Sequence, residues 1–231
     1  MNENNINFRE HPRGGLANSP IENCGETHLP CVVLVDTSAS MGSVKDQLQG
    51  GLEALAEALD EQARGRVEFC VISFDDEARI LVPFGPAYDF ETPRIDCGGM
   101  TAMHAAVELG LGEIEARKKQ YKANGTAYYR PWMFMLTDGG ANDADNGSFA
   151  LLLQSQRDRH CTFFPVGIGE QVDKDLLKSL KEDGKILTAS KENFKGAFVW
   201  LSNSLIRTSS SNPGQSIILP APADFQLEIE A

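Results

Sequence analysis

The chain lacks any long hydrophobic run, although 42% of its 231 residues are hydrophobic. No stretch approaches the roughly 18 consecutive apolar residues that a membrane-spanning helix needs. The polar N-terminus, Met1–Asn5, also lacks the apolar segment that is typical of a secretion signal. We therefore expect no membrane association, a cytoplasmic location, and enough apolar residues to bury a sizeable core.

Positive charge is scarce: 21 Lys and Arg stand against 33 Asp and Glu, which gives a net charge of −12. An acidic surface repels phosphate backbones and anionic lipids, so binding to nucleic acid or to a membrane surface is disfavoured. The alternative interpretation is that the charge serves only solubility. One basic cluster lies near the end of a predicted helix, where cations are favourable, and we do not expect it to be a binding patch. Its members are Arg117, Lys118, Lys119 and Lys122.

The cysteines are odd in number and lack CxxC spacing, which supports neither a complete disulfide framework nor a zinc site. The five are Cys24, Cys31, Cys70, Cys97 and Cys161. Cys31, Cys70 and Cys161 lie in or beside apolar runs, so we expect them to be small core residues with free thiols. The phosphate-binding patterns GxxxxGK(S/T) and GxGxxG and the hydrolase pattern GxSxG are also missing, and functions that depend on them are unsupported.

Short apolar runs alternate with amphipathic segments along most of the chain. This alternation predicts an α/β fold, a Rossmann-like three-layer sandwich with a mostly parallel central sheet. The turn at 75–77 is too short for a crossover, so it predicts one antiparallel edge strand. Gly50 and Gly51 lie inside a predicted helix, and we expect them to allow close packing on the sheet. Strands are predicted over 30–36, 67–74, 80–84, 132–136, 161–168 and 186–189, and helices over 43–64, 102–119, 148–159, 173–182 and 193–208.

Polar residues follow two of the predicted strands, at the point where each strand ends. Asp36, Ser38 and Ser40 come directly after the apolar run 32–35, and Asp138 closes the strand at 132–136. Thr101 stands where a Gly-rich loop leads into a helix. Because ligands of open α/β sheets bind at the carboxyl ends of the strands, we expect these five residues to converge. Carboxylate and hydroxyl oxygens suit a hard cation such as Mg²⁺.

Each of these residues also has a purely structural interpretation. Ser38, Ser40 or Ser43 could cap the first helix, and Thr101 could cap the second. Asp138, which precedes two glycines, could be a turn residue. His104 lies three residues after Thr101, but a structural or surface histidine is the simpler interpretation.

The ordered set resembles the metal-ion-dependent adhesion site of von Willebrand factor type A (VWA) domains. That family uses Asp-x-Ser-x-Ser, a distant Thr after a Gly-rich loop, and a later Asp before Gly. The chain matches with Asp36, Ser38, Ser40, Thr101 and Asp138. The resemblance implies the VWA fold and a bound Mg²⁺, with Mn²⁺ or Ca²⁺ as other options. It also implies that some ligands act through water and that an Asp or Glu of a protein partner completes the metal shell.

The resemblance extends further to bacterial cytoplasmic VWA proteins of the tellurium-resistance TerY or YegL type. It rests on the segments 35–41, 136–139 and 164–169 and on Asp143, where that group often has an acidic residue. Met100 departs from the more usual Gly-Gly-Thr. The resemblance implies a non-enzymatic role in stress response or defence, with PP2C-type phosphatases or Ser/Thr kinases as partners. It leaves the oligomeric state open.

Two other functions compete with a metal-dependent interaction module. A phosphoryl-transfer enzyme of haloacid-dehalogenase type also places an Asp after the first strand next to Mg²⁺. However, it needs a second Asp two residues later, where this chain has Ser38. An extracellular adhesin VWA domain is the other alternative, and the absence of a secretion signal and the unpaired cysteine count argue against it.

The expected domain organisation is an N-terminal tail at 1–28, the VWA domain at 29–208, and a linker with a C-terminal extension at 209–231. Residues 225–229 alternate apolar and polar side chains, as an edge strand does. The segment either packs on its own domain or supplies an acid that fills the open position of the metal. The candidate acids are Asp224, Glu228 and Glu230.

Overall fold

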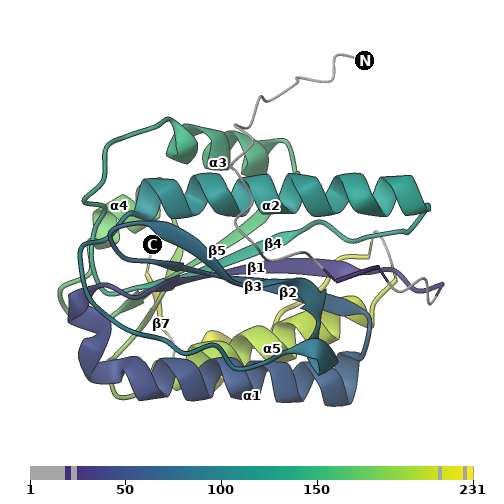
Figure 1. The fold of residues 1–231 in the computed structure, drawn as a ribbon, viewed down its shortest axis with the longest axis horizontal. Coiled ribbons are helices and arrows are strands. Elements are labelled where there is room, and N and C mark those ends of the chain that lie inside the picture. Colours follow the sequence, from purple (N-terminus) through teal and green to yellow (C-terminus); the bar gives the residue numbers. More distant parts are fainter. Residues whose placement is uncertain (1–18, 22–24, 213–214, 226–227, 231) are drawn as a thin grey trace.

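The computed structural model describes residues 19–21, 25–212, 215–225 and 228–230, and it shows a seven-stranded sheet covered on both faces by helices (Figure 1). The order of the strands is β3-β2-β1-β4-β5-β6-β7. The predicted tail at 1–28 therefore lies largely outside the described residues. The strands are β1 Leu29–Asp36, β2 Val67–Phe74, β3 Ala78–Pro86, β4 Trp132–Thr137, β5 Thr162–Ile168, β6 Ile186–Ala189 and β7 Glu228–Glu230.

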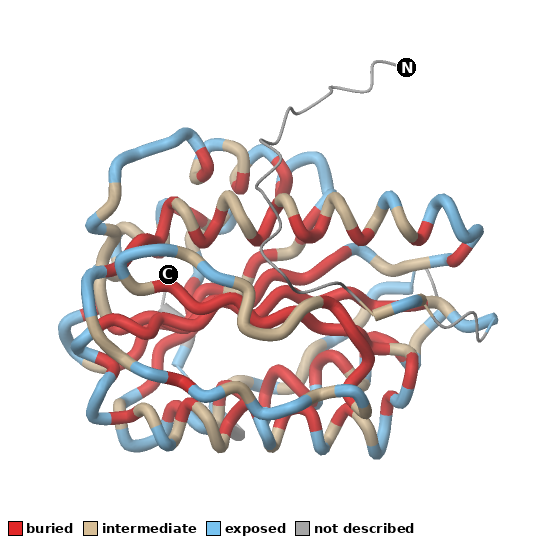
Figure 2. Tube along the Cα trace, viewed as in Figure 1, coloured by how far each residue is buried: buried red, intermediate tan, exposed pale blue. Residues whose placement is uncertain are grey.

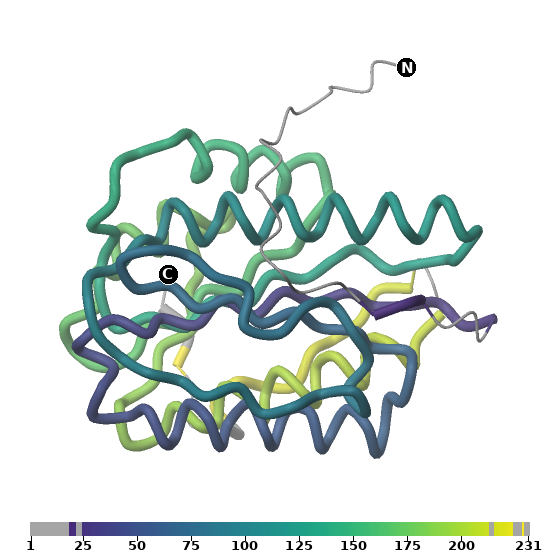
Figure 3. Tube along the Cα trace, viewed as in Figure 1, coloured from purple at the N-terminus to yellow at the C-terminus, as the bar shows by residue number. Residues whose placement is uncertain are grey.

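The five inner strands are parallel, as the alternation of strands and helices predicts. β3 pairs antiparallel with β2 across the short turn, which confirms the predicted edge hairpin. β7 adds a second antiparallel edge, because residues 228–230 pair with 186–188 of β6. The yellow C-terminal segment thus returns to the far edge of the sheet, while purple β1 runs through its middle (Figure 3).

The helices form the two outer layers (Figure 1). α1 Lys45–Ala63 and α5 Lys195–Ser209 lie on one face, and α2 Met103–Asn124, α3 Ser148–Arg157 and α4 Lys174–Ser179 lie on the other. Short 3-10 turns occur at Ala39–Val44, Ala87–Asp89 and Pro222–Phe225. No helix in the described part of the chain is long and apolar enough to cross a membrane.

Two hydrophobic cores lie between these layers, and alternate residues of each inner strand enter opposite cores. Val33 and Val35 pack with α1 and α5, while Val32 and Leu34 pack with α2. Figure 2 shows the result as buried strands between half-buried helices. Every residue of β1, β2 and β4 is buried, as expected of central strands with both faces covered. Cys31, Cys70 and Cys161 are buried free thiols, as predicted.

Gly50 and Gly51 were expected to allow close packing of this helix on the sheet. Only Gly51 allows a close approach, and it does so toward another helix. A Cβ on Gly51 would lie 2.3 Å from Cδ2 of Phe198, so this glycine allows close approach of α5 rather than of the sheet. Gly50 would place a Cβ in open space, with nothing within 4 Å.

A buried charged cluster lies where β2 begins, at the amino ends of the parallel strands, whereas Asp36 lies at their carboxyl ends. Oε2 of Glu68 accepts a hydrogen bond of 2.8 Å from Nε of Arg117 and another from the hydroxyl of Tyr121. Nδ1 of His28 lies 3.4 Å from Oε1 of the same carboxylate. Arg117 also donates to the carbonyl oxygen of Ser19 at 2.9 Å. The cluster joins β2, α2 and the segment that precedes β1.

Candidate metal centre

Asp36 ends β1 and is fully buried. Its Oδ1 accepts a hydrogen bond of 2.8 Å from the backbone N–H of Ser38, and its Oδ2 accepts one of 2.5 Å from the Thr137 hydroxyl. Burial raises the pKa of this carboxyl above its usual value, the hydrogen bonds from Ser38 and Thr137 oppose that shift, and the charge of Asp138 adds to it. A carboxylate in such surroundings is stabilised by a cation.

Ser38, Ser40 and Asp138 form a continuous chain of oxygens beside Asp36. The hydroxyl oxygens of Ser38 and Ser40 are 3.0 Å apart, and the Ser40 hydroxyl donates to Oδ1 of Asp138 at 2.6 Å. Ser38 and Asp138 are buried, whereas Ser40 is exposed. The chain of oxygens is therefore buried at Ser38 and at Asp138 and reaches solvent at Ser40, between them.

The loop at 98–101 turns Thr101 inward and Met100 outward. Gly99 has a φ of +71°, a left-handed conformation that favours glycine. The N–H of Met100 donates to Oδ1 of Asp76 at 2.9 Å, and the Met100 side chain is 57% exposed. Thr101 is buried, and its Oγ1 would lie 3.8 Å from a Cβ built on Gly139. The departure from Gly-Gly-Thr thus leaves Thr101 beside the Asp138 turn, where the sequence predicts it.

The structural interpretations of these residues find little support. The residues that precede α1 and α2 are Val44 and Ala102, whose side chains cannot accept a capping hydrogen bond. The Asp138 carboxylate contacts Ser40 and Lys191 rather than its own turn. Asp143 takes the capping role at α2, because its oxygens accept from the N–H groups of His104 and Ala105 at 3.1 and 2.9 Å. The hydroxyls of Ser38 and Ser40 and the carboxylate of Asp138 therefore contact one another instead of capping helices or closing a turn.

The donor set fits a small hard cation. Six oxygens around Mg²⁺ at about 2.0–2.1 Å place neighbouring oxygens about 2.8–3.0 Å apart. The Ser38 and Ser40 hydroxyls already have the separation of 3.0 Å. Within the described ranges, no three His, Cys, Asp or Glu side chains gather in a way that could hold a metal. This site instead combines two carboxylates with neutral hydroxyls, which favours an oxygen-loving ion over a soft one.

Sequence reasoning missed two residues of the site. Lys191, in the loop after β6, places its Nζ 2.6 Å from Oδ2 of Asp138 and 3.2 Å from the carbonyl oxygen of Ser40. Thr137 is fully buried and positions Asp36 through its hydroxyl. Thr137 directly precedes Asp138 in the segment 136–139 and could have been noticed, whereas nothing in the sequence marks Lys191. His104 stacks on Phe149, with ring centroids 3.6 Å apart, and has the predicted structural role.

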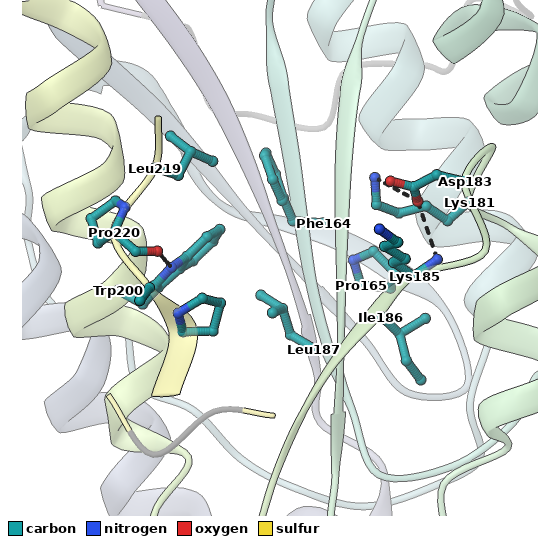
Figure 4. Close-up of a pocket in the computed structure, with 12 residues that line it drawn as sticks. Phe164, Pro165, Lys181, Asp183, Lys185, Ile186, Leu187, Trp200, Leu219 and Pro220 are labelled. Carbon is teal, nitrogen blue, oxygen red and sulfur yellow. Dashed lines mark hydrogen bonds and ion pairs between the residues drawn. The ribbon is translucent and has the colours of Figure 1, made fainter. Parts of the chain in front are cut away.

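A hollow of about 290 Å³ lies under the C-terminal extension, away from the candidate metal centre, and none of the five predicted residues lines it (Figure 4). Phe164 and Trp200 form its apolar wall, and their rings meet edge to face. Nε1 of Trp200 donates to the carbonyl oxygen of Pro220 at 3.1 Å. Together with the pairing of β7 and β6, this contact supports the packing interpretation of the extension. Residues 226 and 227 lie outside the described part of the chain.

Comparison with known proteins now decides the family. The family model of the von Willebrand factor type A domain matches residues 31–199, most of the chain. The chain belongs to the von Willebrand factor type A family. This VWA domain has the expected Rossmann-like fold, and domains of this family are generally interaction modules.

Individual relatives are distant. A curated relative, the uncharacterized protein sll0103 of Synechocystis sp., is 24% identical over 155 residues, which are 65% of this chain and 34% of that protein. A solved von Willebrand factor type A structure from Catenulispora acidiphila has a TM-score of 0.57 at 18% identity, over 78% of this chain and 43% of that one.

Another solved relative carries a metal. Proximal thread matrix protein 1 from the mussel byssus was solved with zinc in its MIDAS motif, the abbreviation for metal-ion-dependent adhesion site. Its TM-score is 0.55 at 17% identity, over 78% of this chain and 48% of that one. This chain therefore spans about a third to a half of these relatives, and their likeness concerns the fold.

Proposed function

We propose that this VWA domain is a non-enzymatic interaction module that grips an acidic side chain of a protein partner through a bound Mg²⁺. The ion would be held by Asp36, Ser38, Ser40, Thr101 and Asp138, some of them through water. The observation that carries the proposal is the chain of oxygens from Asp36 to Asp138, which is buried at both ends and reaches solvent at Ser40 between them.

The charge of the site favours a gripping role. Two carboxylates neutralise a divalent ion, and the hydroxyls add no charge, so a carboxylate of the partner is not repelled. The competing phosphoryl-transfer function needs an acid at position 38. The hydroxyl of Ser38 instead lies 3.0 Å from that of Ser40, an arrangement suited to ligands and not to a proton-transferring acid.

The oxygen donors favour Mg²⁺, with Mn²⁺ or Ca²⁺ as substitutes. The zinc in the mussel relative makes Zn²⁺ a further ion to test.

The four described cysteines are free, which supports a reducing, cytoplasmic location over an extracellular adhesin. A role among TerY- or YegL-like proteins in stress response, with PP2C-type phosphatases or Ser/Thr kinases, rests on the sequence motifs. A pull-down with Mg²⁺ and again with chelator would identify the partner.

Thermal unfolding tests the metal site directly. An ion that binds only the folded state at a hundredfold excess over its Kd adds about 2.7 kcal/mol to the free energy of unfolding. Millimolar Mg²⁺ should therefore raise the Tm of the wild type, and Asp36→Asn should lose that rise. Asp158→Asn removes an exposed carboxylate after α3 and should keep it. An equal rise in all three proteins would show that the ion binds elsewhere.

A further inference from the structure

Lys191 is a charged residue that neither the sequence motif nor the proposed ligand set includes. Its Nζ forms an ion pair of 2.6 Å with Oδ2 of Asp138, whose side chain is almost fully buried. It also donates to the carbonyl oxygen of Ser40 at 3.2 Å. Asp138 is thus shared, because its other oxygen accepts from the Ser40 hydroxyl.

The position of Lys191 is built into the fold. Its aliphatic stem lies over Gly169, where an added Cβ would stand 3.3 Å from Cγ and 3.4 Å from Cε of the lysine. Gly169 has a φ of +76°, and its N–H donates to the carbonyl oxygen of Ala189 at 2.8 Å. The turns after β5 and β6 are therefore joined, and together they direct the ammonium group toward Asp138.

The ammonium group changes the charge of the whole site. Asp36, Asp138 and Lys191 together carry a net charge of −1, which becomes +1 when a divalent ion is bound. Without Lys191 the two totals would be −2 and zero. A cation close to the ion repels it, while a positive total attracts an incoming carboxylate.

We propose that Lys191 is a specificity-determining residue of the metal site, which weakens the binding of the metal ion and strengthens the binding of the partner's carboxylate. This inference rests on the proposed function. It assigns the preference for an acidic ligand to a fixed charge of the chain as well as to the metal. The two effects have opposite signs, and a lysine that merely tethered its loop would not produce them.

The test compares Lys191→Met with Lys191→Arg in the full chain. Met keeps the stem over Gly169 and removes the charge, while Arg keeps the charge. Titration calorimetry with MgCl₂ measures the affinity for the ion. Fluorescence anisotropy in saturating Mg²⁺ measures the binding of a fluorescein-labelled deca-glutamate peptide, with deca-glutamine as the uncharged control.

Lys191→Met should bind Mg²⁺ about tenfold more tightly and the glutamate peptide about tenfold more weakly, as expected for one unit charge in a partly exposed site. Lys191→Arg should remain within about twofold of the wild type in both. If Lys191→Met changes neither affinity, or shifts both in one direction, the inference is overturned. A wild type that binds Mg²⁺ but not the peptide also overturns it. A wild type that binds no Mg²⁺ refutes the proposed function itself.

Discussion

At the scale of single residues, Asp36 is the most constrained group of the site. It is a buried carboxylate with a raised pKa, held by one backbone N–H and one hydroxyl. A charge in this position lowers the stability of the metal-free protein. A cation bound beside it, as proposed, would offset the cost, and folding and metal binding would then be coupled through this one side chain.

Thr137 should control that coupling. Thr137→Val has the same shape but removes the donor to Oδ2 of Asp36, which leaves a buried oxygen unsatisfied. We expect a loss of about 1–3 kcal/mol in the free energy of unfolding and a smaller rise of Tm with Mg²⁺. Thr137→Ser keeps the hydroxyl and should keep the Mg²⁺ response. A full response in the valine variant would contradict a positioning role.

Four residues of the motif could be predicted because they follow strand ends, which the parallel sheet brings together, and Thr101 could be predicted from the Gly-rich loop that precedes it. The structure places Asp36, Ser38, Ser40 and Asp138 in hydrogen-bond contact and Thr101 next to the Asp138 turn. Lys191 could not be predicted. Its contact depends on how two neighbouring turns meet, and chain spacing carries no information about that geometry.

At the scale of elements, Gly50 and Gly51 of α1 allow the effect of helix propensity on stability to be measured apart from the effect of helix packing. Gly50→Ala places a methyl group in open space and should raise the free energy of unfolding by about 0.5–1 kcal/mol through helix propensity. Gly51→Ala would collide with the buried ring of Phe198 and should lower it by about 1–3 kcal/mol. Urea unfolding of both variants is the measurement. Equal effects at the two positions would refute the proposed close approach of α1 and α5.

Element types were predictable from the hydrophobic periodicity, whereas element ends were predicted for some elements and not for others. The strand at 186–189 was predicted with its observed bounds, but α1 starts at Lys45 because a 3-10 turn holds Ala39–Val44. That turn places Ser40 opposite Asp138, so the shifted helix start serves the site. The second antiparallel edge strand, β7, pairs with β6 because of where the C-terminal extension docks. The alternation of apolar and polar residues within the extension does not determine that place.

At the scale of the whole molecule, the two ends of the sheet have opposite roles. The carboxyl ends of the strands carry the proposed metal centre, and the amino ends carry the buried cluster around Glu68. The sequence indicated Arg117 only as part of a basic helix end. The structure instead buries it completely, because Glu68 of β2 supplies the compensating charge. Pairing between residues so distant in the chain requires the tertiary structure.

This cluster should govern stability in acid. Burial alone would raise the pKa of Glu68, but the hydrogen bond from His28, the charge of Arg117 and the hydrogen bonds from Tyr121 and Arg117 outweigh it, and the pKa falls below its usual value. A lowered folded pKa means that the unfolded chain takes up the proton first. The stabilisation is therefore complete above the unfolded pKa of about 4.5 and is lost as the pH falls through the folded pKa.

Glu68→Gln should remove this dependence. At pH 7 it leaves Arg117 buried without its charge partner, and we expect a loss of about 3–5 kcal/mol in the free energy of unfolding. Below pH 4.5 the wild type loses the same interaction by protonation, so the two Tm curves should converge as the pH falls. Glu26→Gln, which breaks a half-exposed pair with Arg66 at 3.6 Å, should follow the wild type at every pH. Parallel curves for wild type and Glu68→Gln between pH 7 and 3.5 would show that the buried carboxylate does not link protonation to folding.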